Sequence, residues 1–472
     1  MVRLVSAFVL SLSVAALAQS VSFNGDVVLV QDPTGALTGL VGTDNMTIFP
    51  SHQEQFCRAA FNAARAGGLA DEFDGVITFS AAETLTDLDN VWQGSPVRAD
   101  GTGYGRANSP SMTSYTSSKL GQCVFMGTLG RTTSLFGGQG PEALPSDPDA
   151  AWAPSLGIQL PGITSLTGIE MLGHEYGHHW LLGVEFDQND GRGRQHFLRG
   201  YSGDGDNGQM GSPNQHYSHN ADSRSVMYGE CITDLGGGSF RFEGCARKYS
   251  QIDQYLMGLR GVNEVAPMMV LEDPTNPGKG VDSVAMGRTS SGMTVNGLTR
   301  HDIAADEIVR AMGARIPGYP NARNCWRVAF VVVLAPGQTT VPQAMLDKVN
   351  RYRARWSPWF YAATDGRGTM DSRLTGNGCL VMPGFDAGVS EADAGLSEPE
   401  LDAGLAEADA GLDAGEPVTV PSDADAGTPP SKWDTYVANE TGKIRPGCGC
   451  GAGGGEFLAL LGLAVWFARR RS

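Results

Sequence analysis

The sequence predicts an α+β domain over residues 19–382, and three observations support this prediction. Strand-like apolar runs alternate with helix-like stretches, the chain of 472 residues is 41% hydrophobic, and the composition changes abruptly after residue 382. The strand-like runs are 27–30, 75–79, 123–129 and 328–334, and the helix-like stretches are 54–65, 165–182 and 342–363. We expect the N-terminal part of the domain to supply its sheet, and a loop-rich segment to run from 183 to 245.

Residues 1–18 have the pattern of a secretory signal peptide. Arg3 supplies a short positive region, residues 4–15 are apolar, and Ala16-Leu17-Ala18 is a small-x-small cleavage site. The mature chain is therefore expected to begin near Gln19 and to be exported.

Export permits disulfides in the body of the chain, which has an even number of cysteines. The pair Cys231 and Cys245 is the most local, so we expect it to form a bridge. The other pairings stay open, because six cysteines allow 15 connectivities. The six are Cys57, Cys123, Cys231, Cys245, Cys325 and Cys379.

Residues 383–446 are predicted to form an extended acidic linker. This segment is rich in Asp, Ala, Gly and Pro, and it holds 12 acidic residues between Asp386 and Asp425 without a Lys or Arg. Like charges repel and little apolar surface is present to bury. A calcium-binding repeat is the alternative, although the Asp-Ala-Gly units are irregularly spaced. The formal net charge of −17 is concentrated here, and nothing in the chain indicates a nucleic-acid partner.

Residues 447–472 are predicted to form a C-terminal tail with a short hydrophobic helix. A Gly-Cys-Gly-Cys motif at 447–450 precedes an apolar run at 457–468 and three arginines at 469–471. A helix over that run would extend about 18 Å, less than the roughly 30 Å of bilayer hydrocarbon. The arrangement resembles the MYXO-CTERM class of sorting tails. That resemblance implies cleavage by a sorting protease near Cys448 or Cys450 and delivery to the cell surface, and the alternative is an ordinary C-terminal membrane anchor. We expect membrane contact through this tail before processing, and a location at the cell surface or outer membrane, or in the medium after processing.

The segment 167–182 carries the motif His-Glu-x-x-His within a predicted amphipathic helix. Thr167 and Glu170 have the spacing of a capping box, which favours a helix start here. Residues 169, 172, 176 and 180 share one apolar face, whereas His174 and His178 project from nearly the opposite face. Two imidazoles four residues apart can bind one Zn²⁺ and leave room for a third protein ligand and a water.

Glu175 follows the first histidine directly. Zinc lowers the pKa of a bound water, and this carboxylate is placed to take its proton and to return it to a leaving amine. The other interpretation is a helix whose histidines form only surface hydrogen bonds, since the motif is short enough to occur by chance.

The motif resembles that of the zincin metallopeptidases, which implies a zincin-like fold and zinc-dependent hydrolysis of peptide bonds. In the metzincin subgroup a Gly and a third His follow at offsets that fall here on Leu181 and Val184, so the chain is not a standard metzincin. Residues 224–229 nonetheless resemble the methionine turn of that subgroup, with Met227 at its centre.

The third ligand is expected downstream of the helix, where we favour His216 over His219, His196 and Glu185. The preference rests partly on a looser resemblance to secreted bacterial His-Glu-x-x-His proteins. These have a His-aromatic-Ser segment and a later Tyr-Ser-…-Tyr-Leu-Met-Gly-Leu segment, which correspond to 216–218 and 249–259 here.

Three further side chains are candidates for supporting roles. Tyr255 is a candidate catalytic residue that would stabilise an oxyanion, with a place in the helix core as the alternative. Asp253 is a candidate for orienting a ligand. His179 lies about 100° around the helix from His178 and is expected on the helix flank or behind the metal ligands.

We therefore expect a zinc-dependent endopeptidase that acts on extracellular protein or peptide. Zinc is its expected cofactor, with His174, His178 and His216 as ligands and Glu175 as general base. The alternative is a non-catalytic surface adhesion module that keeps the same fold around a structural zinc ion. The intact Glu175 favours the first interpretation, and the missing metzincin ligand favours the second.

Overall fold

The computed structural model of the chain describes residues 19–41, 52–82, 92–104, 108–129, 144–150, 166–181, 183–195, 216–217, 220–243, 245, 247–272, 274 and 293–376. All of them lie in one of the two compact units into which the chain divides, and the other unit, Met382–Ile444, contains none of them. The predicted signal peptide, acidic linker and C-terminal tail lie outside the described residues. Within the described ranges, no helix is both long and apolar enough to cross a bilayer.

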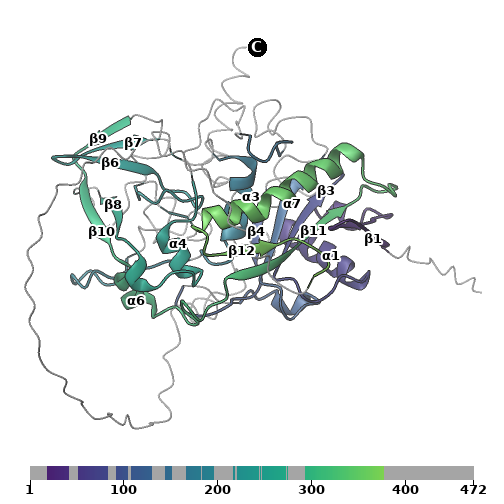
Figure 1. The fold of residues 1–472 in the computed structure, drawn as a ribbon, viewed down its shortest axis with the longest axis horizontal. Coiled ribbons are helices and arrows are strands. Elements are labelled where there is room, and N and C mark those ends of the chain that lie inside the picture. Colours follow the sequence, from purple (N-terminus) through teal and green to yellow (C-terminus); the bar gives the residue numbers. More distant parts are fainter. Residues whose placement is uncertain are drawn as a thin grey trace, which may run out of the picture. The chain divides into compact units, whose positions relative to one another are not determined.

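A mixed seven-stranded sheet forms the centre of the described fold (Figure 1). Its order is β1-β2-β11-β3-β5-β4, with the short β12 also beside β11. The neighbours β2, β11, β3 and β5 run parallel, whereas β1 and β4 are antiparallel to their partners. The strands are β1 (Val21–Asn24), β2 (Val27–Val30), β3 (Gly75–Ser80), β4 (Gln93–Pro96), β5 (Gln122–Thr128), β11 (Cys325–Val333) and β12 (Thr369–Asp371).

Helices cover both faces of this sheet. Because successive strand residues point to opposite faces, Val331 of β11 packs with α1 (His52–Ala66), whereas Phe330 and Val332 pack with α3 (Gly168–Gly177) and α7 (Gln343–Ala363). The result is a three-layered arrangement in which the helix with the His-Glu-x-x-His motif lies on the same face as α7.

The strands and helices expected from the sequence are present, with two corrections. The expectation that the N-terminal part alone supplies the sheet is wrong, because β11 lies between β2 and β3. Each of its nine residues is buried, as a central strand requires. The helix expected over 165–182 is shorter than predicted, since α3 ends at Gly177.

The remaining elements form two smaller sheets and two further α-helices. The first sheet has the order β6-β7-β9, and the second pairs β10 with β8. Side chains of both sheets, including Phe240 and Leu271, share a small core of their own. The elements are β6 (Cys231–Gly236), β7 (Ser239–Glu243), β8 (Met268–Glu272), β9 (Met293–Asn296), β10 (Thr299–Ile303), α4 (Gln251–Leu256) and α6 (Ala305–Met312), with 3₁₀ turns at Thr38–Val41, Met112–Ser114 and Val262–Glu264.

Two disulfides are described within the body. Cys231 and Cys245 are bonded, as the sequence predicted, with 6.2 Å between their Cα atoms. Cys57 of α1 and Cys123 of β5 form the other bridge, with a Cα separation of 6.1 Å. The second bridge therefore joins the helix on one face of the sheet to a strand within it.

Candidate metal centre

Helix α3 begins with the capping box that the sequence predicted. The Thr167 side chain accepts a hydrogen bond from the Glu170 N–H at 3.3 Å, and the Glu170 carboxylate accepts one from the Thr167 N–H at 2.7 Å. These bonds satisfy two of the backbone donors that a helix start leaves open. The apolar face predicted for this segment, from Ile169 to Trp180, lies in the main core.

The end of α3 places the second histidine of the motif. His178 is the C-cap with helical backbone angles, and the next residues continue in tighter turns, with the His179 N–H bonded to the Tyr176 carbonyl. Gly183 has a φ of 71°, a conformation that ends helices readily. His178 therefore still lies one turn beyond His174, although the regular helix has ended.

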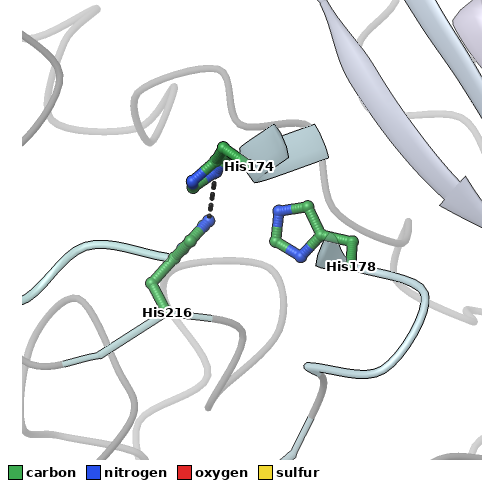
Figure 2. A group of neighbouring side chains, drawn as sticks. All are labelled: His174, His178 and His216. Carbon is green, nitrogen blue, oxygen red and sulfur yellow. Dashed lines mark hydrogen bonds between the residues drawn. The ribbon is translucent and has the colours of Figure 1, made fainter. Parts of the chain in front are cut away.

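Three histidines come together beside this helix end (Figure 2). One ring nitrogen from each of His174, His178 and His216 lies within 4.8 Å of the others, and all three side chains are buried. The Nε2 atoms of His174 and His216 are 3.2 Å apart, and their rings are nearly parallel. The His178 ring is almost perpendicular to that of His174.

This arrangement fits a zinc ion in donor chemistry and in spacing. Zinc–nitrogen distances of about 2.0–2.1 Å in a tetrahedral site put two ligand nitrogens about 3.3 Å apart. The His174–His216 pair has that spacing, and the His178 ring borders the same space. Among the described residues this is the one such group of His, Cys, Asp or Glu side chains.

Contacts behind His174 fix which of its nitrogens faces the group. Its Nδ1 lies 2.5 Å from the Val226 carbonyl oxygen. A carbonyl can only accept, so Nδ1 is the donor, and the neutral form of this ring, which a metal requires, would present a bare Nε2 toward His216. The Tyr228 ring packs against both imidazoles, with centroids 4.5 Å from that of His174 and 4.4 Å from that of His216.

The loop around Met227 lies against α3. A Cβ on Gly177 would stand 2.5 Å from the Met227 sulfur, so the Met227 side chain can pack this closely only because residue 177 is glycine. The buried Arg247 guanidinium holds the loop from the other side by donating to the carbonyls of Ser225 and Gly229. The segment that resembles a methionine turn thus contacts the helix one residue before His178.

Glu175 lies between α3 and the edge strand β4. Its carboxylate accepts a 2.6 Å hydrogen bond from the Gly94 N–H, and its backbone carbonyl accepts one from the Gln122 side chain at 2.9 Å. A Cβ on Gly94 would lie 1.9 Å from the Glu175 carbonyl oxygen. Sequence reasoning missed this contact, because the polar run Gln-Gly-Ser-Pro has no pattern typical of a strand.

His179 faces away from the three histidines. Its Nδ1 contacts the Gly121 carbonyl at 3.1 Å, and its Nε2 is 3.7 Å from the Asp100 carboxylate. Burial would raise the pKa of Asp100, but hydrogen bonds and charges from His179, Arg315 and Trp180 lower it. His179 therefore belongs to an ionic network on the helix flank, in agreement with its expected position.

Tyr255 of α4 is tied to the same network. Its hydroxyl accepts a hydrogen bond from the Arg315 N–H at 3.2 Å, and burial raises the pKa of the phenol. The Arg315 guanidinium donates to Asp100 at 2.8 Å. A catalytic role for Tyr255 stays a prediction.

Glu185, His196 and His219 are the alternatives to His216 as third ligand. The Glu185 carboxylate pairs with Arg194 at 3.4 Å and is not part of the histidine group. His196 and His219 lie outside the described residues. Of the two candidates that the structure describes, His216 and Glu185, His216 lies beside His174 and His178.

Comparison with protein-family models, with curated proteins and with solved structures finds no match to this chain. The functional argument therefore depends on the chain's own residues.

Proposed function

We propose that this protein is a zinc-dependent endopeptidase of extracellular protein or peptide, with His174, His178 and His216 as its metal ligands. The observation that carries the proposal is the convergence of the three buried imidazoles of His174, His178 and His216, with the buried Glu175 directly after His174 in α3. Export, predicted from residues 1–18, favours a substrate outside the cell.

Different groups at the site would carry out different parts of the proposed reaction. A bound zinc ion would act as a Lewis acid that polarises the scissile carbonyl and acidifies a water molecule. Glu175 would accept the proton of the attacking water and pass it to the amine nitrogen as the carbon–nitrogen bond breaks. The Gly94 N–H holds one oxygen of that carboxylate and thereby orients it for both transfers.

The test compares the purified native chain with Glu175→Gln. A glutamine keeps the shape of the side chain but cannot accept and return the proton. We expect near-stoichiometric zinc in both proteins and cleavage of casein by the native chain alone. Glu54→Gln is the matched control, because Glu54 is another buried glutamate on the opposite face of the sheet, and this variant should cleave casein.

Two other outcomes would contradict the proposal. Zinc in both proteins without cleavage of casein or of a mixed peptide library would favour the non-catalytic adhesion module with structural zinc. Absence of zinc from the native chain after growth with added zinc would exclude both functions.

A further inference from the structure

The buried carboxylate of Asp253 has more partners than its place in a helix cap requires. It is the N3 residue of α4 and is fully buried. Within the capping box it accepts a hydrogen bond from the Ser250 N–H at 2.8 Å. It also accepts hydrogen bonds from the hydroxyls of Tyr217, at 2.7 Å, and Ser225. A buried charge needs such partners, but these two come from segments far away in the sequence.

The first of these partners, Tyr217, directly follows His216 in the sequence. The Tyr217 backbone N–H donates to the Met227 carbonyl at 2.9 Å. The Tyr217 side chain and backbone are thus both fixed. The backbone from which the His216 imidazole projects is thereby restrained, because the next residue is held at two points.

The second partner leads to His174. The Ser225 hydroxyl donates to Asp253 and accepts a hydrogen bond from the Met227 N–H at 3.0 Å. Val226 lies between Ser225 and Met227, and its carbonyl accepts a hydrogen bond from His174 Nδ1. The orientation of His174 therefore depends on a loop that Asp253 holds.

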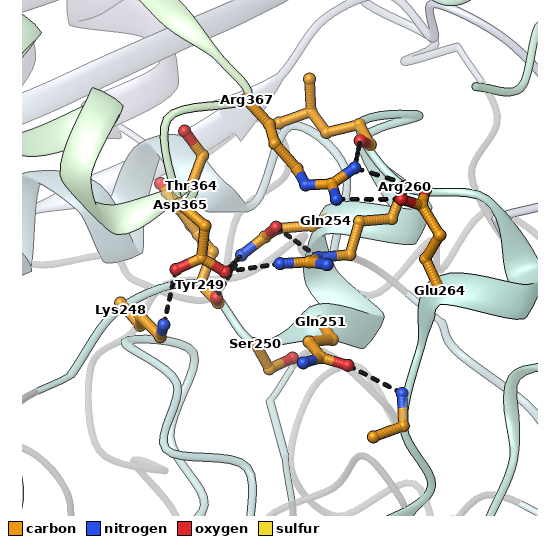
Figure 3. Close-up of polar contacts among 12 residues, drawn as sticks. Lys248, Tyr249, Ser250, Gln251, Gln254, Arg260, Glu264, Thr364, Asp365 and Arg367 are labelled. Atoms are coloured by element: carbon orange, nitrogen blue, oxygen red, sulfur yellow. Dashed lines mark hydrogen bonds and ion pairs between the residues drawn. The ribbon is translucent and has the colours of Figure 1, made fainter. Parts of the chain in front are cut away.

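The start of α4 is itself fixed to the rest of the fold. The Tyr249 hydroxyl donates to the Gly173 carbonyl of α3 at 2.6 Å. Figure 3 shows Asp365, which follows α7, receiving hydrogen bonds from Lys248, Gln254 and Arg260. Asp253 thus stands on a helix that is anchored to both α3 and the end of α7.

We infer that Asp253 is a positioning residue for the metal centre, which joins the His216 segment to the loop that orients His174. The inference rests on the proposed function, because it assigns the role through the metal ligands. One carboxylate outside the ligand group thereby sets the relative placement of two imidazoles from different segments, as partners behind metal ligands commonly do.

The test measures the dissociation constant for Zn²⁺ and the visible absorption of the Co²⁺-loaded chain in three variants. Asp253→Asn should raise the zinc dissociation constant by about 10–100-fold. Tyr217→Phe and Ser225→Ala should each raise it by less, because each removes one connection only. All three should alter the Co²⁺ spectrum, which reports ligand geometry.

Two matched controls separate positioning from a general loss of stability. Tyr352→Phe and Ser357→Ala likewise remove a buried hydroxyl, but these hydroxyls lie on α7 and donate to backbone carbonyls instead of to Asp253. They should lower the thermal midpoint of the metal-free chain, as Tyr217→Phe and Ser225→Ala should. Their zinc affinity and Co²⁺ spectrum should remain native.

The outcomes distinguish this inference from the proposed function. If the native chain binds zinc and both Tyr217→Phe and Ser225→Ala keep the native affinity and spectrum, the inference is wrong while the metal site stands. These two variants decide the question even if Asp253→Asn does not fold. If the native chain binds no zinc, the proposed function and this inference fail together.

Discussion

The helix-borne histidines and His216 reach the same space by different means. His174 and His178 are set by the pitch of one helix, which is held by its own cap and by the core beneath it. His216 is set by contacts among segments that are distant in the sequence, through Tyr217, the Met227 loop and α4. One part of this site therefore arises from local helix geometry, whereas the other arises from tertiary contacts.

Removal of His216, the proposed third ligand, should have the largest effect. His216→Ala should weaken zinc binding by at least about 100-fold, at or beyond the upper end of the range for partners behind metal ligands. Isothermal titration with zinc measures this directly. Glu185→Ala is the control, because Glu185 pairs with Arg194 instead. A large loss in Glu185→Ala together with native affinity in His216→Ala would assign the third ligand to Glu185.

The second largest effect is expected at Gly177, where α3 contacts the Met227 loop. In Gly177→Ala the new Cβ would lie 2.5 Å from the Met227 sulfur, so the Met227 side chain or its loop must shift. Overpacking of this kind costs about 2 kcal/mol of unfolding free energy, and we expect zinc affinity to fall as well. Chemical denaturation of the metal-free chain measures the first effect.

The control for this overpacking is Gly39→Ala, where a Cβ meets no atom within 4 Å and φ is not positive. It should change neither stability nor zinc affinity. Native stability in Gly177→Ala would mean that the loop is not pressed against the helix.

The smallest effect concerns the ionic contacts that hold α4 to the end of α7. Burial would raise the pKa of Asp365, but hydrogen bonds from Lys248, Gln254 and Arg260 lower it. Asp365→Asn should therefore cost about 1 kcal/mol of unfolding free energy at neutral pH, a modest value because the side chain is partly exposed. Asparagine also tolerates the φ of 53° at this position.

The pH dependence of the stability lost in Asp365→Asn follows from the direction of the Asp365 pKa shift. The folded-state pKa lies below the unfolded value of about 3.9, so the stabilisation is complete above pH of about 4 and is lost as pH falls through the folded-state value. The difference between the native chain and Asp365→Asn should be constant from pH 8 to 5 and shrink in stronger acid. Asp306→Asn, in an exposed pair with Arg310, should match the native chain throughout. A cost that grows in acid would contradict this account.

The local part of the centre could be predicted from the sequence. The capping box at Thr167, the apolar face and the spacing of the two histidines all depend on neighbours along one helix, and α3 has each of them. The buried run at 328–334 likewise predicted a strand, although not its central position. That position depends on which strands pair, and strand pairing is not a local property.

The sequence limited the third ligand to a few candidate residues but could not identify it. These candidates are His216, His219, His196 and Glu185. The place of His216 in the fold depends on contacts of Tyr217 with Met227 and Asp253. The Gly94 contact with Glu175 left no sequence signal, because a glycine required for close approach looks like any other glycine.

The bridge between Cys57 and Cys123 has a consequence for where this centre can assemble. Its two cysteines are 66 residues apart, and the loop that they close contains β3, β4 and Gly94. In the chain-entropy account a loop of this length contributes about 4 kcal/mol. A reduced chain in the cytosol would lack that restraint on the edge strand beside Glu175. On the proposed function, oxidation of these two thiols after export would restrain the strand that holds the proposed general base Glu175.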